Sequence, residues 1–361
     1  LDLKRITLNS EIKKLRLNWL DSLRGCAILF LIIMHYIGAV EARGLIPVEL
    51  VDYVKSIFRV ATPLFITVFG FTISYIFYGK VSAPHDLKKI VFWSLKRLPK
   101  VLLAREFIVL LYSLSHPEKI PSLIDTLLYM QFSQAGEILT FYFVAILVTP
   151  YILYLVYSYS FKILLPIFSV IYFISYFIGV NYSSPENSGF FRLFFYDVYP
   201  FFPFYACVIS GIYLAILYLN LSDDVKRLKV FFSISIAAML IGLLYLNTLT
   251  SSLLHDLSFA NFKAPPHPAY LMLYTGLSVF ISILIALAVN SYFFPRKIER
   301  IFIVIGRNSL LAYVLHYFLH FTVPITIFLT GSKNTIVEVL IFLMILITIF
   351  YVLKRRNNYK G

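Results

Sequence analysis

Long apolar runs separated by short polar stretches dominate the pattern along this chain. Ten such runs are found near residues 23–41, 56–78, 98–115, 138–158, 162–180, 199–219, 229–248, 269–292, 301–323 and 335–353. An α-helix needs about 20 mostly apolar residues to cross the hydrocarbon core of a bilayer, and each run approaches that length. The pattern therefore predicts an all-α fold, a polytopic membrane helix bundle of about ten transmembrane helices within a lipid bilayer.

Composition supports the same fold class. Hydrophobic residues make up 60% of the 361 positions and charged residues only 14%, whereas soluble domains average about 45–50% apolar and about 25% charged residues. Soluble, disordered, collagen-like and disulfide-rich proteins are therefore excluded. The two cysteines, Cys26 and Cys207, both lie in apolar runs, so no disulfide is expected.

Basic residues are distributed unevenly along the chain. The net charge is +14, but the Lys and Arg residues punctuate the apolar runs and form no basic face of the kind that binds nucleic acid. The two terminal segments and every second connection hold 22 of the 32 basic residues, and the alternate connections hold 7. Cytoplasmic segments carry the Lys and Arg excess. Both termini are therefore expected in the cytoplasm, in a multi-pass protein of the cell membrane.

A single transmembrane domain accounts for most of the chain. Residues 1–18 are polar and basic, and they are expected to form a cytoplasmic segment and no cleavable signal, because the first apolar run is long enough to span. The predicted ten-helix domain covers 19–353, and 354–361 form a basic cytoplasmic tail. No internal repeat is visible.

The first predicted helix carries two ionisable residues within its apolar run, Arg24 and His35. Eleven residues of α-helix correspond to about three full turns and a rise of about 16 Å, so both side chains point the same way. Intramembrane ionisable residues are costly and mark functional sites by default. The pair indicates either a path into the membrane from the cytosol, or a snorkelling arginine with an incidental buried histidine.

The ninth predicted helix carries a polar stripe. Ser309, Tyr313, His316 and His320 follow one another at helical spacing on one face, after Arg307. Such a stripe either hydrogen-bonds neighbouring helices together or lines a water-filled cavity.

The third predicted helix begins with the basic residues Lys96, Arg97 and Lys100, and then carries Arg105 and Glu106. These bases are either ordinary cytoplasmic charges or ligands for a nucleotide phosphate, which arginine binds bidentately. Adjacent helical residues point about 100° apart, so Arg105 and Glu106 are expected to pair with other helices and not with each other.

Two connecting segments carry further candidate residues, and several known catalytic motifs are absent. Glu137 is either a surface residue or a base at the binding site of an acceptor substrate. The prolines after Lys263 predict a rigid turn. The sequence has no phosphate-binding glycine loop, dinucleotide fingerprint, zinc-binding helix or nucleophile elbow. If the protein is an enzyme, it uses isolated polar groups within helices, and no metal is expected.

Four segments resemble the membrane-bound acyltransferase-3 family. LDSLRGCAILFLIIMHY (Leu20 to Tyr36) resembles its opening helix, in which an Arg-x10-His pattern matches Arg24 and His35. ATPLFITVFGFTISY (61–75), FPFYACVISGIYLA (202–215) and IGRNSLLAYVLHYF (305–318) are similar to later helices. Two features depart from the family pattern: Arg97-Leu98-Pro99-Lys100 stands where members have Arg-x-x-Arg, and Glu137 lacks tryptophan neighbours.

The resemblance implies an acyltransferase that moves an acyl group, usually acetyl, from cytosolic acyl-CoA to a hydroxyl of a glycan or lipid-linked sugar. His35 and His316 are then the catalytic candidates, as general base or acyl acceptor. The cofactor-binding candidates for the acyl-CoA phosphates are Arg24, Arg97, Lys100 and Arg105. Tyr313, Ser309 and His316 are candidate donors to the developing oxyanion.

The competing classes are a transporter of a lipid-linked sugar or small anion, in which broken helices and repeat symmetry are expected, and a non-catalytic scaffold.

Overall fold

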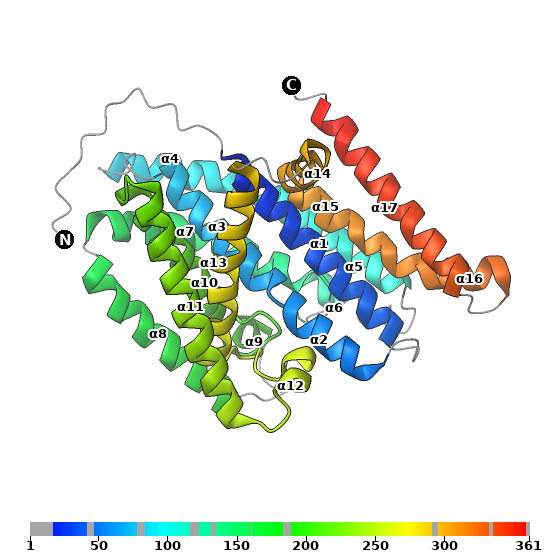
Figure 1. The fold of residues 1–361 in the computed structure, drawn as a ribbon, viewed down its shortest axis with the longest axis horizontal. Helices are drawn as coiled ribbons and strands as arrows, with labels where there is room; N and C mark the ends of the chain where they lie inside the picture. The colour runs from blue at the N-terminus through cyan, green and yellow to red at the C-terminus, as the bar shows by residue number, and fades with distance from the viewer. Residues whose placement is uncertain are drawn as a thin grey trace.

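The computed structural model describes residues 17–41, 47–77, 84–115, 123–130, 135–159, 161–182, 189–290, 295–331 and 335–358. All the regular elements in these ranges are helices (Figure 1), as the apolar pattern predicts. In this part of the chain eight helices are long and apolar enough to cross a membrane, or nine if one sharply bent pair is counted as a single span. The polytopic membrane helix bundle is thereby confirmed.

Three long helices form the centre of the bundle: α1 (Asn18–Glu41), α3 (Ala61–Phe77) and α10 (Phe201–Asn220). The helix before α3 is α2 (Val48–Phe58), and a turn at residues 59–60 separates the two, so the second predicted run is two helices. Glycines let these helices meet at backbone distance. A Cβ added to Gly70 would lie 2.2 Å from the Val208 oxygen, and one added to Gly211 would lie 2.0 Å from the Thr67 oxygen. Small residues at helix interfaces are the usual means of close packing in membranes.

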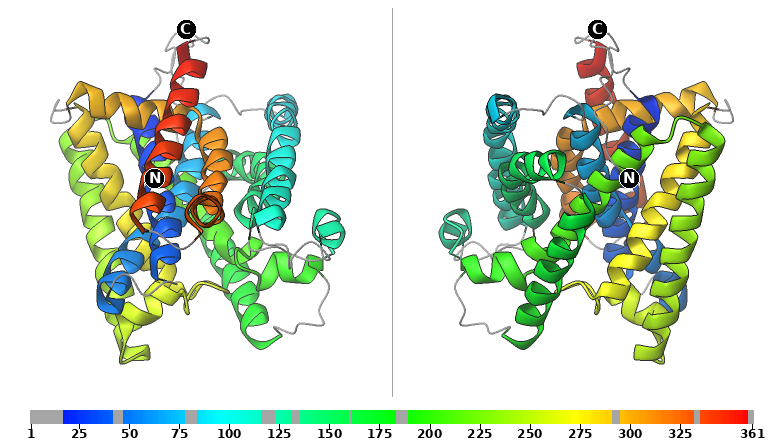
Figure 2. Two further views of the ribbon diagram at one scale, coloured as in Figure 1. Left: turned by 90° about the vertical axis from the view of Figure 1, so that its right-hand side faces the viewer. Right: turned by 90° about the vertical axis from the view of Figure 1, so that its left-hand side faces the viewer.

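Two groups of helices flank this centre on opposite sides (Figure 2). On one side α11 (Asp224–Leu249) packs against α13 (Pro268–Asn290). On the other side are α4 (Pro84–Leu95), α5 (Leu98–Ser115), α6 (Leu123–Leu127) and α7 (Glu137–Ser158), and α8 (Phe161–Asn181) packs against α10. The third predicted run is thus helical as α5. Its Lys100, Arg105 and Glu106 keep it out of the count of apolar spans, and the number of ten crossings stays a prediction.

The ninth predicted run is not one straight helix. α14 (Arg296–Arg307) and α15 (Ser309–His316) are bent by 87° where Asn308 separates them. A 3-10 segment, η2 (Tyr317–Phe321), then leads to α16 (Thr322–Thr330) and α17 (Thr335–Asn358). The prediction of a continuous helix over 301–323 is wrong, because α14 is amphipathic, with Arg296, Lys297 and Arg300 exposed, and lies across the end of the bundle (Figure 1).

The two ends of the bundle carry different short helices. α4, α14 and the last turns of α17 lie at the upper end in Figure 1, and α9 (Gly189–Phe195) and α12 (Leu253–Phe259) lie at the lower end. The upper end holds the basic connections that the sequence assigns to the cytoplasm. We call the upper end the inner end and the lower end the outer end.

Candidate functional site

The two candidate histidines lie next to each other in the structure although they are far apart in the sequence. Their ring centroids are 5.2 Å apart, with His35 on α1 and His316 at the end of α15. Tyr317 is next to both, with its ring centroid 6.3 Å from that of His35 and 4.4 Å from that of His316. The structure thus joins the first and ninth predicted helices into one site, which we call the histidine pair.

The histidines differ in burial. The side chain of His35 is exposed, whereas only 1% of His316 is exposed. His35 lies in the second half of α1. His316 is enclosed by Tyr313 and Tyr317, whose ring centroids lie 4.9 Å and 4.4 Å from its own.

The contact of His316 Nδ1 defines its tautomer. Nδ1 lies within hydrogen-bonding distance of the Tyr313 carbonyl oxygen. A carbonyl oxygen only accepts, so Nδ1 must carry the proton, and in the neutral ring Nε2 keeps its lone pair. A histidine oriented in this way is suited to act as a general base or nucleophile through Nε2.

Arg24 lies toward the inner end of the same helix. It donates to the Thr72 hydroxyl on α3 at 2.8 Å, and its guanidinium is 3.7 Å from the Asp21 carboxylate. Asp21 is also 3.3 Å from Nε of Arg307, at the bend between α14 and α15. α1 is one unbroken helix from Asn18 to Glu41, as the spacing of Arg24 and His35 requires.

Arg97 is another base of the predicted phosphate site. It lies near enough to Arg24 for the two positive charges to interact. Its guanidinium stacks on Trp93 at 3.1 Å from the ring centroid. Burial, together with the positive charge of Arg24, lowers the pKa of Arg97 to about 10. The arginine remains charged at neutral pH, and the repulsion between the two guanidiniums favours an anion between them.

The other two bases have different surroundings. Lys100 is exposed at the start of α5. The expectation that Arg105 and Glu106 do not pair with each other is wrong: Nη1 of Arg105 lies 3.0 Å and 2.9 Å from the two carboxylate oxygens of Glu106. The side chains bend toward each other because only 2% of Arg105 is exposed and a buried guanidinium requires a counterion. Arg105 also stacks on Tyr129 at 4.1 Å and so lies apart from the contacts of Arg24.

The remaining polar candidates of the ninth run are placed less uniformly. Tyr313 is 6% exposed and its hydroxyl is 3.4 Å from that of Tyr317. Ser309 begins α15, two turns before His316. The side chain of His320 lies outside the described residues.

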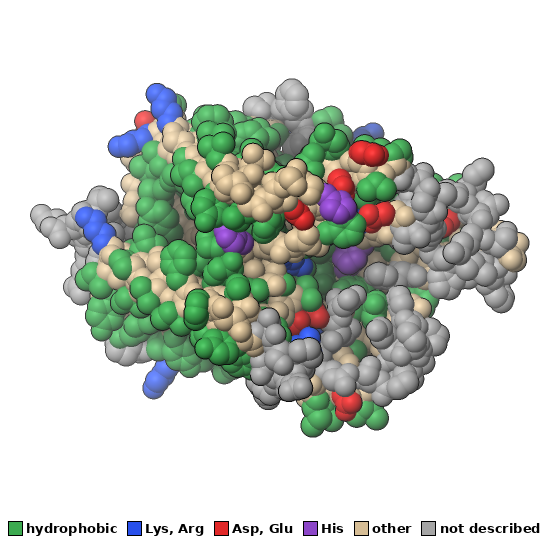
Figure 3. Space-filling view, turned by 90° about the horizontal axis from the view of Figure 1, so that it is seen from below, with side chains coloured by type: hydrophobic (Ala, Val, Ile, Leu, Met, Phe, Trp, Pro, Cys, Tyr) green, Lys and Arg blue, Asp and Glu red, His purple; other side chains and the backbone are tan. Residues whose placement is uncertain are grey.

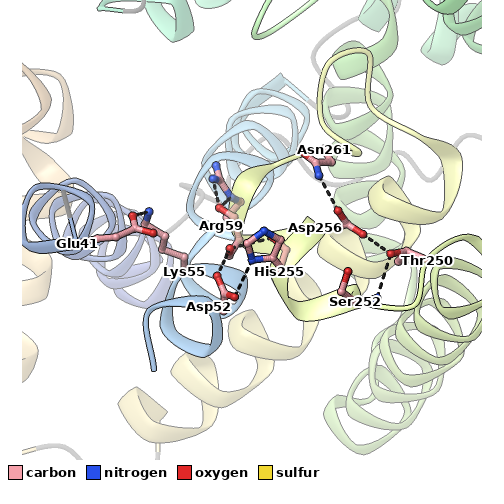
Figure 4. Close-up of polar contacts among 10 residues, drawn as sticks. Glu41, Asp52, Lys55, Arg59, Thr250, Ser252, His255, Asp256 and Asn261 are labelled. Carbon is pink, nitrogen blue, oxygen red and sulfur yellow. Dashed lines mark hydrogen bonds and ion pairs between the residues drawn. The ribbon is translucent and has the colours of Figure 1, made fainter. Parts of the chain in front are cut away.

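A polar network at the outer end holds α12 against α2 (Figure 4). Asp52 on α2 accepts a hydrogen bond from the Ser258 hydroxyl, and its other oxygen is 3.0 Å from Nδ1 of His255. Arg59 donates to the Ser258 carbonyl oxygen, and Lys55 pairs with Glu41. Sequence reasoning missed the contacts of α12 with Asp52 and Arg59, because the residues that they join are about two hundred positions apart and no local pattern connects them.

The fold and the site define a class: a polytopic membrane protein in which two histidines from distant helices lie next to each other. The family model described as an acyltransferase domain matches residues 17–355. The chain therefore belongs to the acyltransferase-3 family, as the resemblance predicts, and an acyltransferase activity is supported in general terms. A search of the curated proteins and a search of the solved structures each returned no match.

Cys26 and Cys207 are both free and buried. No group of three or more His, Cys, Asp or Glu residues that could hold a metal ion is present among the residues that the structure describes.

Proposed function

We propose that the protein transfers an acyl group, acetyl in the first instance, from cytosolic acyl-CoA to a hydroxyl group of a saccharide. The contact between His35 and His316 is the observation that carries this proposal. It brings two imidazoles together, about 16 Å along α1 from Arg24. Arg24 and Arg97 supply positive charge at the inner end for the donor's phosphates.

Acyl transfer requires one proton movement at each end of the reaction. The acceptor oxygen attacks the thioester carbonyl carbon, the C–S bond breaks, and CoA leaves as a thiolate that is then protonated. Nε2 of His316 is the base suited to take the acceptor's hydroxyl proton, because Nδ1 is held by the Tyr313 carbonyl. The Tyr313 and Tyr317 hydroxyls are candidate donors to the carbonyl oxygen as negative charge develops there.

The donor half of this proposal is tested with purified protein and labelled acetyl-CoA. We expect binding, and transfer or slow hydrolysis of the acetyl group. Arg24→Ala should raise the Kd for acetyl-CoA about tenfold or more, because a charge-assisted contact to phosphate is lost. Arg300→Ala, which removes an exposed arginine of α14, is the matched control and should leave the Kd within about twofold. Equal affinity of the Arg24→Ala variant and the wild type would contradict the phosphate site.

A carrier is the second candidate function, and the bend between α14 and α15 is what favours it. Transporters place substrates at broken helices, but they usually have a matching pair in each half of the molecule. Among the described residues only one such pair occurs. Exchange of a labelled sugar phosphate across vesicles that contain the protein, without any use of acetyl-CoA, would support the carrier over the enzyme.

A further inference from the structure

Four charged side chains converge near the outer end of the bundle, outside the histidine pair. They are Glu137 at the start of α7, Arg192 on α9, Asp197 just after α9, and Lys263 in the turn after α12. Glu137 and Asp197 are each 7% exposed and Lys263 is 9% exposed. The charges of Asp197, Lys263 and Arg192 all act on the Glu137 carboxylate, as does that of Arg105. We call these four residues the outer charge cluster.

The members of the outer charge cluster are close but do not neutralise one another directly. In the described part of the chain no ion pair within 4 Å joins them. Oε2 of Glu137 and Nε of Arg192 are both buried and have no hydrogen-bond partner among those residues. A buried acceptor or donor that is left unpaired destabilises the folded protein, and more so when it is charged. An unpaired acceptor and an unpaired donor in one cluster therefore point to a ligand that bonds to the cluster.

Contacts with neighbouring residues fix the positions of Lys263 and Asp197. Lys263 directs its ammonium group over the Tyr199 ring at 3.8 Å from the centroid. Asp197 accepts from the Val198 backbone N–H at 2.7 Å, and burial raises the pKa of its carboxyl group. The turn that carries Lys263 is closed by a bridge between Lys263 and Pro266 and is tied to α8 through the Tyr172 hydroxyl, which donates to the Pro266 carbonyl at 2.9 Å. The site is thus built from rigid elements.

A hydrogen bond links this cluster to the histidine pair. The backbone N–H of Gly136, directly before Glu137, donates to the Tyr317 hydroxyl at 3.2 Å. Tyr317 in turn contacts His316. On the face seen from below, which is the outer end, charged and histidine side chains gather around a hollow near the centre (Figure 3). A molecule bound at the cluster would therefore lie next to the imidazoles and on the opposite side of them from Arg24.

We propose that the outer charge cluster is the binding site for the acyl acceptor, and that the acceptor is a polyhydroxylated molecule, a saccharide. Carboxyl groups accept hydrogen bonds from hydroxyl groups, and Lys and Arg donate to hydroxyl oxygens. The two carboxyl and two cationic groups of the cluster therefore offer both kinds of bond to the hydroxyl groups of one ligand. Tyr199 offers an apolar ring face beside Lys263. This inference rests on the proposed acyl transfer and adds the residues that recognise its second substrate.

The test uses the full-length protein in proteoliposomes, with acetyl-CoA as donor and a panel of hexoses, N-acetylhexosamines and their methyl glycosides as probes. We expect at least one sugar to accelerate the release of CoA with saturation. Glu137→Gln keeps the shape of the side chain but removes its charge, and it should raise the KM for that sugar about tenfold or more. Lys263→Met should do the same. The Kd for acetyl-CoA, measured separately, should change by less than about twofold in both variants.

Glu49→Gln is the matched control, because Glu49 is exposed on α2 near the outer end. It should leave the KM for the sugar unchanged. An unaltered KM in both Glu137→Gln and Lys263→Met would overturn the assignment of the site. Failure of every sugar to stimulate CoA release by a protein that binds and hydrolyses acetyl-CoA would overturn the substrate class. Failure of the wild type to bind acetyl-CoA would instead contradict the proposed function itself.

Discussion

At the scale of single residues, the two histidines differ in what their surroundings allow. The Tyr313 carbonyl oxygen keeps the proton of His316 on Nδ1, and the ring is almost completely buried. His35 is exposed and stands against His316 from another helix. The buried ring is thus pre-oriented for proton transfer through Nε2, and the exposed ring can be reached by a molecule that approaches the pair.

The contact between the rings predicts that they act together. His35→Ala and His316→Ala should each lower the turnover of acetyl transfer by about 10²–10⁴-fold, the usual contribution of a general acid or base. Because groups that work as a unit are strongly non-additive, the double variant should be within about tenfold of the slower single variant. The steady-state rate of CoA release gives the turnover of the two single variants and of the double variant. Multiplication of the two single effects in the double variant would mean that the histidines act independently.

At the scale of helices, glycines allow the backbones of α1 and α14 to come into direct contact. α1 and α14 meet at Gly25 and Gly306, where an added Cβ would lie 2.1 Å from the Phe302 oxygen and 1.7 Å from the Asp21 oxygen respectively. These contacts are with main-chain atoms that cannot rotate away. The same crossing brings Arg307 to Asp21, and Asp21 in turn holds Arg24. Close packing of α1 on α14 therefore positions the inner arginine.

Gly306→Ala tests this dependence. The added methyl group would force α14 away from α1, which we expect to cost about 1–3 kcal/mol of stability or more and to lower the thermal midpoint in detergent. Gly38→Ala on α1 is the comparison, since its Cβ would meet only the end of the Lys55 side chain, at 4.0 Å. Alanine favours a helix over glycine, so that variant should be neutral or more stable. Equal midpoints for the two variants would show that the α1–α14 contact can open freely.

At the scale of the whole molecule, the sequence predicts the class of fold and the composition of the histidine pair, but not how its parts meet. Apolar length alone identifies helices in all ten predicted runs, and intramembrane cost singles out Arg24, His35 and His316. The bend at Asn308 was not predictable, because hydropathy does not distinguish a surface helix followed by a span from one long span. Of the outer charge cluster the sequence singled out only Glu137 as a possible base. Arg192 lies on the short helix α9, and Asp197 and Lys263 lie outside the helices, where a charge gives no signal until the fold buries it.

The orientation of the bundle follows from the basic residues and can be measured. Reporter fusions after Lys229 and after Lys263 should lie on opposite sides of the membrane, because most of α11 lies between the two positions. The basic residues near the N-terminal end of α11 place that end in the cytoplasm. An alkaline phosphatase and a green fluorescent protein fusion at each position report the side independently. The same side for both positions would contradict the assignment of inner and outer ends.

The unbroken helix between Arg24 and His35 also fixes the register of the two halves of the site. A helix advances about 1.5 Å and rotates about 100° with each residue. One residue inserted between these positions would thus turn the imidazole of His35 away from His316 while leaving Arg24 in place, although no side chain had been altered. Three or four inserted residues would restore the rotation but shift the histidine by roughly 5 Å. α1 therefore acts as a spacer of defined length and phase, and its residue count constrains the chemistry as strongly as the identity of either end.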